Sequence, residues 1–166
     1  GALWRWILEG NYGILNHYLQ MILKIEPIYW LTSSSTAMLG VVMASVWWTI
    51  GYNTVIFLAG LQDVPRELME AAEIDGAGSF IIPCLRSTTF FVVLTTIIYS
   101  LQVFGQVYTM TGGGPRYSTL VLVQHLYING FRLFKLGYSS TISVVLFIVI
   151  FLISMGIFRV NKQTLS

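Results

Sequence analysis

The sequence is poor in charge, cysteine and histidine, and each scarcity excludes a class of protein. Only 10% of its 166 residues are Asp, Glu, Lys or Arg, whereas an ordinary soluble domain has about 25%. Two histidines and one cysteine, Cys84, are too few for a disulfide framework or a zinc site. A net charge of +2, carried by scattered basic residues, is too small for a nucleic-acid surface. We therefore expect no bound metal and no nucleic-acid partner.

The sequence also lacks the residue patterns of enzymes and nucleotide-binding proteins. Its long apolar runs contain no Asp, Glu, Lys, Arg or His, so they offer no nucleophile with a base and no paired carboxylates. The glycine-rich run T-G-G-G-P at 111–115 matches neither G-x-x-x-x-G-K-[ST] nor G-x-G-x-x-G. We expect no catalytic residue and no cofactor, and any ATP used with this protein should be hydrolysed by a different chain.

What is abundant is apolar surface, with 55% hydrophobic residues and a mean hydropathy of +0.74. Three uncharged runs stand out, at Thr36–Leu58, Thr88–Tyr108 and Leu136–Phe158. A hydrocarbon core of about 30 Å needs roughly 20 helical residues, which each run supplies. The sequence predicts an all-α integral membrane helical bundle with about three transmembrane helices, forming one domain over residues 1–166.

The segment before the first run has a different character. Aromatic residues alternate there with a few charges, which predicts a short interfacial helix over about Ile14–Ile25. Its His17 has no carboxylate or second histidine nearby, so we expect no functional role for it. The chain begins with Gly1 and shows no signal peptide, and we expect it to be a fragment of a longer protein.

Charge is concentrated in one stretch, Asp63–Gly78, which holds five of the seven acidic residues. Pro65 suits a first helical turn, Glu, Leu, Met and Ala favour a helix, and Gly76 and Gly78 can end it. The i, i+3, i+4 and i+7 spacing should place Leu68, Ala71, Ala72 and Asp75 on one face, where the small alanines would let another surface approach closely. Two interpretations remain open, a helix that docks on a partner protein and an amphipathic connector lying on the membrane.

Uncharged polar side chains in the first two runs form a second candidate site. Tyr99, Gln102 and Gln106 have i, i+3, i+7 spacing and should share a helix face, while Trp48, Tyr52 and Asn53 lie close together in the first run. Aromatic rings stack on the C–H faces of a sugar and amides bind its hydroxyls, so the six residues predict a solute path. The alternative is that they form hydrogen bonds between helices.

The distribution of basic residues does not set the orientation in the membrane. With three spans, the side of the acidic stretch carries four basic residues and the other side five. The four are Arg66, Arg86, Arg159 and Lys162, and the five are Arg5, Lys24, Arg116, Arg132 and Lys135.

Motifs along nearly the whole chain resemble one family. The sequence E-A-A-E-I-D-G-A at 70–77 resembles the EAA motif of the membrane subunits of bacterial ABC importers. Flanking segments, among them F-L-A-G-L-Q-D-V-P-R-E-L, L-Q-V-F-G-Q-V-Y-T-M-T-G-G-G-P-R-Y-S-T and L-G-Y-S-S-T-I-S-V-V-L-F, are similar to sugar permeases of the maltose and glycerol-phosphate type.

The resemblance implies a function, partners and an orientation. It implies an inner-membrane, multi-pass permease subunit for sugars or related polar solutes, working with a second permease, a dimer of ATPase subunits and an extracytoplasmic solute-binding protein. The N-terminus would lie outside and the C-terminus in the cytoplasm. The coupling loop would span 63–86, and its ATPase-coupling surface would consist of Glu70, Ala71, Ala72, Asp75, Gly76 and Ala77.

Two departures from the family lead to a distinct alternative. Members usually carry additional spans ahead of this region, and their segment between the glycine and the proline is longer than Gly76 to Pro83 here. The shorter segment predicts weakened coupling to the ATPase. The alternative is therefore a truncated or degenerate membrane module that binds partners or oligomerises without transport.

Overall fold

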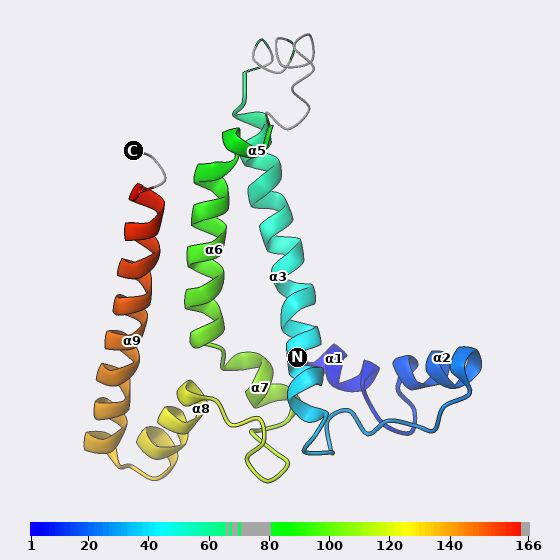
Figure 1. Ribbon diagram of the computed structural model, residues 1–166. Helices are drawn as coiled ribbons and strands as arrows, with labels where there is room; N and C mark the ends of the chain where they lie inside the picture. Colours follow the sequence, from blue (N-terminus) through cyan, green and yellow to red (C-terminus); the bar gives the residue numbers. More distant parts are fainter. Residues whose placement is uncertain (66, 68–69, 71–80, 164–166) are drawn as a thin grey trace. The chain divides into compact units, whose positions relative to one another are not determined.

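The computed structural model describes residues 1–65, 67, 70 and 81–163, and all regular structure in these residues is helical (Figure 1). This confirms the predicted all-α class. The chain divides into two compact units, Gly1–Trp47 with Leu101–Phe151 and Trp48–Ser100 with Leu152–Ser166. The helices α3 (Ala37–Gln62) and α9 (Leu136–Gln163) each contribute residues to both units.

Among the described residues, two helices have the length and composition to cross a membrane. They comprise Ala37–Gln62 of α3 and Leu136–Asn161 of α9, with mean hydropathies of 1.5 and 2.8. Each has 26 residues, or about 39 Å at 1.5 Å per residue, which exceeds a core of about 30 Å. The first and third predicted runs are thus confirmed as span-length helices. No residue in the most apolar stretch of the α9 span is buried, so the apolar side chains of α9 need lipid or a partner protein to cover them.

The second predicted run is not one continuous helix. Helix α6 ends at Leu101 and a separate helix, α7 (Gly105–Met110), follows after three residues. With 16 residues from Arg86 to Leu101, α6 is about 24 Å long, short of the roughly 30 Å core. The expectation of an unbroken span over 88–108 was wrong. The break precedes Gly105, a poor helix former, and lets α7 bury Val107 and Met110.

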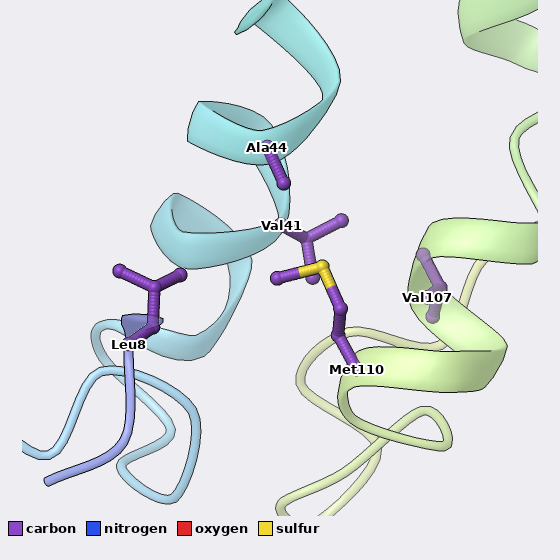
Figure 2. Close-up of a cluster of buried hydrophobic side chains, with 5 residues drawn as sticks. All are labelled: Leu8, Val41, Ala44, Val107 and Met110. Carbon is purple, nitrogen blue, oxygen red and sulfur yellow. The ribbon is translucent and has the colours of Figure 1, made fainter. Parts of the chain in front are cut away.

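The first unit has a small apolar core. Leu8, which follows α1 (Ala2–Ile7), packs with Val41 and Ala44 of α3 and with Val107 and Met110 of α7 (Figure 2). The unit also contains α2 (Ile14–Leu23), α8 (Leu122–Tyr127) and the π-helical turn η1 (Ile128–Arg132). Helix α2 confirms the short helix predicted near residues 14–25.

One buried amide ties the N-terminal segment together. The side chain of Asn16, only 3% exposed, donates to the carbonyl oxygens of Gly10 and Ile28, both at 2.8 Å. Its oxygen accepts from the indole N–H of Trp30 at 2.9 Å and from the backbone N–H of Ile28 at 3.3 Å. All hydrogen-bonding positions of the amide are used, which fixes the loop after α2 against its N-terminal end.

In the second unit, α6 runs beside the C-terminal half of α3 (Figure 1). The amide nitrogen of Asn53 lies 3.3 Å from the Thr96 hydroxyl, and Gly60 approaches Thr88 without room for a side chain. Phe90 of α6 meets Phe158 of α9 edge to face, with ring centres 5.0 Å apart. A short helix, α5 (Ile81–Cys84), precedes α6.

Candidate functional site

The predicted ATPase-coupling surface lies almost entirely outside the described residues. Glu70 is described, and its side chain is exposed, as is that of Glu67 three residues before it. Ala71, Ala72, Asp75, Gly76 and Ala77 lie outside the described part of the chain. The role of the six residues therefore stays a prediction. The exposure of Glu70 leaves its carboxylate accessible to a basic partner.

The predicted path residues of α3 lie in the second unit and differ in their surroundings. The side chains of Trp48 and Tyr52 are 67% and 51% exposed. Asn53 is partly buried and donates to Thr96 of α6, which is the hydrogen bond between helices considered as the alternative. Asn53 thus holds two helices together, while the two aromatic side chains are accessible to a ligand, to lipid or to another subunit.

The helix break changes the predicted path in the second run. Tyr99 lies on α6 and is 65% exposed, Gln102 follows the end of that helix, and Gln106 belongs to α7. The i, i+3, i+7 spacing places side chains on one face only within a single continuous helix. The predicted common face of these three residues is therefore wrong. Gln106 is partly buried in the first unit, and Gln102 is exposed.

The glycine-rich segment after α7 is a hydrogen-bonded turn. Gly112 and Gly113 have φ angles of +63° and +92°, which glycine adopts without strain. The hydroxyls of Thr111 and Thr119 lie 2.7 Å apart, and Thr119 donates to the carbonyl of Gly114 at 2.7 Å. The buried Gln124 side chain packs against Gly113 at a distance that leaves little room for a Cβ. Helix α7 ends at Met110, directly before this segment, because a run of glycines followed by a proline cannot continue a helix.

The first unit also contains an arrangement that the sequence analysis did not single out. Four aromatic rings pack on one another, with neighbouring ring centres 5.2 to 5.7 Å apart. They come from α7, from the residue directly before α7, from α8 and from η1. Arg132 lies over two of these rings. We call this the aromatic–arginine cluster, and it consists of Phe104, Tyr108, Tyr127, Phe131 and Arg132.

The guanidinium of Arg132 is held by both tyrosines of this cluster. Its central carbon lies 5.9 Å from the ring centre of Tyr108 and 6.0 Å from that of Tyr127, within cation–π range. It also donates a hydrogen bond to the Tyr108 hydroxyl at 3.1 Å. This hydrogen bond is the main reason why the pKa of Arg132 is raised above its ordinary value, and the guanidinium is charged at physiological pH, as in any arginine. The spacing of Phe104 to Tyr108 and of Tyr127 to Phe131, four residues each, was the signal available in the sequence.

A groove of about 820 Å³ lies in the second unit between α6 and the C-terminal part of α9. Its lining includes Phe90 and Val93 on one side and Ile153 and Ile157 on the other. Such a surface suits hydrocarbon rather than a sugar, because it offers few partners for hydroxyl groups. No group of three or more His, Cys, Asp or Glu that could hold a metal occurs in residues 1–65, 67, 70 and 81–163.

Comparison with known families gives one match over most of the chain. The family described as binding-protein-dependent transport system inner membrane component matches residues 13–165. This range includes the acidic stretch, the two span-length helices and the aromatic–arginine cluster.

Individual relatives are substantially similar to the chain. It is 38% identical over 168 residues to the sn-glycerol-3-phosphate transport system permease protein UgpA of Agrobacterium fabrum (strain C58 / ATCC 33970), covering 96% of this chain and 56% of that protein. It is 35% identical to the sulfoquinovosyl glycerol transport system permease protein SmoG of the same organism, covering 89% and 49%. The chain thus spans about half the length of these relatives.

Solved structures share the fold. One subunit of a bacterial ABC transporter involved in the import of the acidic polysaccharide alginate superposes with a TM-score of 0.83 at 19% identity, covering 97% of this chain and 58% of that one. A second structure, the alginate transporter in complex with an alginate pentasaccharide-bound periplasmic protein, gives 0.82 at 18% identity, covering 96% and 57%.

Proposed function

Because the chain belongs to the family of binding-protein-dependent transport system inner membrane components, we propose that it forms part of the permease subunit of an ATP-driven importer for sugars or related polar solutes. The observation that carries this proposal is the family match over residues 13–165. The two span-length helices support it, because their exposed apolar side chains need a bilayer or neighbouring subunits.

The relatives narrow the class of solute that we propose. Their names state that UgpA belongs to a glycerol-3-phosphate system and SmoG to a sulfoquinovosyl glycerol system. Both solutes combine hydroxyl groups with an acidic group, a phosphate or a sulfonate. We propose a small polyhydroxylated solute for this chain as well, with exposed aromatic rings such as Trp48, Tyr52 and Tyr99 contributing stacking surfaces.

Energy for transport would come from a separate ATPase dimer that binds the acidic stretch. In this proposal Glu70 pairs with a basic group of the ATPase, and Ala71 and Ala72 allow close approach. Asp75, Gly76 and Ala77 would complete the surface. A second permease subunit and an extracytoplasmic solute-binding protein complete the assembly, and the acidic stretch faces the cytoplasm of a bacterial inner membrane.

The sidedness is tested with single cysteines. Cys84 is the only cysteine, so Cys84→Ser gives a cysteine-free background into which Glu70→Cys or Arg116→Cys is introduced. Intact cells are treated with a membrane-impermeant maleimide. We expect labelling at position 116, outside the cell, and labelling at position 70 only after lysis. Labelling of position 70 in intact cells would contradict the orientation and the coupling role.

Coupling is tested in proteoliposomes that contain the chain together with the proposed ATPase, second permease and binding protein. Glu70→Lys reverses a charge at the proposed contact and should lower ATP-driven uptake by about tenfold, the effect of losing roughly 1.4 kcal/mol. Glu67→Lys, also exposed, is the matched control on the same stretch and should have less effect. A complex that assembles but shows no uptake with the unmodified chain would instead favour a partner-binding module without transport.

A further inference from the structure

We propose that the aromatic–arginine cluster binds the acidic group of a sugar-like solute, with Arg132 as its anion-binding residue. The ligand class is a polyhydroxylated ring or chain that bears a carboxylate, phosphate or sulfonate. The inference rests on the proposed transport function and deepens it, because it assigns the charge of the solute and one residue that recognises it.

Most N–H donors of Arg132 are available to a ligand. Among the described residues, the guanidinium of Arg132 donates a hydrogen bond to the Tyr108 hydroxyl at 3.1 Å and interacts more weakly with the Tyr127 hydroxyl, so most of its five N–H donors remain available. No ion pair between Arg132 and a carboxylate occurs among the residues that the structure describes. A fixed guanidinium with unused donors can form paired hydrogen bonds to an oxyanion group.

The guanidinium of Arg132 is also held in position before a ligand arrives. Tyr108 comes from α7 and Tyr127 from α8, and their ring planes meet at 80° with ring centres 5.6 Å apart. The guanidinium lies over both rings, so two helices restrict one flexible side chain. Binding then costs less conformational entropy than it would at a free surface arginine.

An exposed apolar surface lies beside the charge of Arg132. The ring of Phe131 stacks on Tyr127 with ring centres 5.7 Å apart and is 66% exposed. An exposed ring next to an arginine presents a stacking face for the C–H groups of a sugar and a cation for its acidic group. Phe131 and Arg132 also lie in a π-helical turn, a rare conformation that is frequent at functional sites.

A lipid headgroup has the same anionic chemistry and must be distinguished from a soluble solute. Arg132 precedes the span-length helix α9 by four residues, which is close to the depth of headgroups. A headgroup contact, however, needs only a flexible cation that reaches the interface. Since Arg132 is instead held in place by Tyr108 and Tyr127, a solute that requires a defined geometry fits better.

The test measures binding to the full chain in phosphatidylcholine nanodiscs, without ATPase or binding protein. The probes are D-glucuronate, D-glucose 6-phosphate and D-glucose 6-sulfate, with D-glucose as the uncharged counterpart. We expect at least one anion to bind about tenfold or more tightly than glucose. Arg132→Gln should abolish this preference, and Arg132→Lys should restore only part of it because lysine lacks the planar guanidinium. Arg5→Gln, at an exposed arginine of α1, is the matched control.

Four results would overturn the proposal. The first three are the same affinity for glucose and all three anions, an anion preference that survives Arg132→Gln, and an anion preference lost equally in the Arg5 control. A fourth is a change in Arg132→Gln confined to binding of phosphatidylglycerol added to the nanodiscs, which would make the cluster a headgroup contact. Circular dichroism of each variant shows whether it is folded, and Tyr108→Phe, which keeps the ring, should reduce the preference without abolishing it.

The outcome is separable from that of the transport proposal. Arg132-dependent anion binding without ATP-driven uptake would leave the site intact and contradict the transport function. ATP-driven uptake by a chain whose anion affinity does not change in Arg132→Gln would contradict the anion site and leave the transport function intact.

Discussion

Replacing Asn16 with leucine should destabilise the N-terminal part of the first unit substantially. The change removes hydrogen bonds of 2.8, 2.8 and 2.9 Å and a longer one of 3.3 Å. At about 1 kcal/mol each, the three short ones amount to about 3 kcal/mol. The carbonyls of Gly10 and Ile28 and the indole of Trp30 then lose their partner, which adds about 1 kcal/mol or more.

The expected loss in unfolding free energy is therefore about 4 kcal/mol, or a melting temperature lower by about 8 to 16 °C for a chain of this size. The assay is thermal unfolding in detergent, followed by tryptophan fluorescence because Trp30 donates to Asn16. Asn11→Leu is the control, since Asn11 is exposed and accepts only a long 3.5 Å hydrogen bond from Tyr29. Equal melting temperatures for the two variants would refute the assignment of Asn16 as the residue that fixes this segment.

Two further predictions concern the contact between α3 and α6 in the second unit. Gly60→Ala should destabilise the protein by about 1 to 3 kcal/mol, because the added methyl would lie 3.0 Å from Cγ2 of Thr88 and closer still to its hydroxyl. Gly51 lies on the same helix with open space around it, so Gly51→Ala should be neutral or stabilising by up to about 1 kcal/mol. Equal effects of the two alanine variants on thermal unfolding would argue against the close approach of Gly60 to Thr88. The Asn53–Thr96 hydrogen bond should give a coupling energy of about 0.6 kcal/mol in a double-mutant cycle of Asn53→Ala and Thr96→Val. A coupling indistinguishable from zero would show that this bond does not stabilise the helix pair.

The helix break in the second apolar run shows where sequence reasoning failed. The run over 88–108 is uncharged, and hydropathy alone does not separate one long helix from two short ones. What divides it is packing, since Val107 is fully buried and Val103 lies against the same core as Leu8 and Val41. Burial of these side chains compensates for the interrupted backbone, a gain that depends on residues about 60 to 100 positions away.

The aromatic–arginine cluster was missed for a related reason. Each half shows a regular spacing, Phe104 to Tyr108 and Tyr127 to Phe131, but nothing in the sequence indicates that the halves meet. Asn16 was also overlooked, because an asparagine between Leu15 and His17 of a short helix does not reveal that two of its partners lie 12 and 14 residues later. Contacts between distant segments form only when the helices pack.

The sequence by itself determined the helical class, the two span-length helices and the family, because hydropathy, helix propensity and local motifs are properties of neighbouring residues. Tertiary structure decided where the middle run breaks, which amide is buried and which arginine lies over aromatic rings. Those outcomes depend on how much apolar surface distant segments bury together and on which polar groups then find partners. That free energy arises only when the segments are in contact.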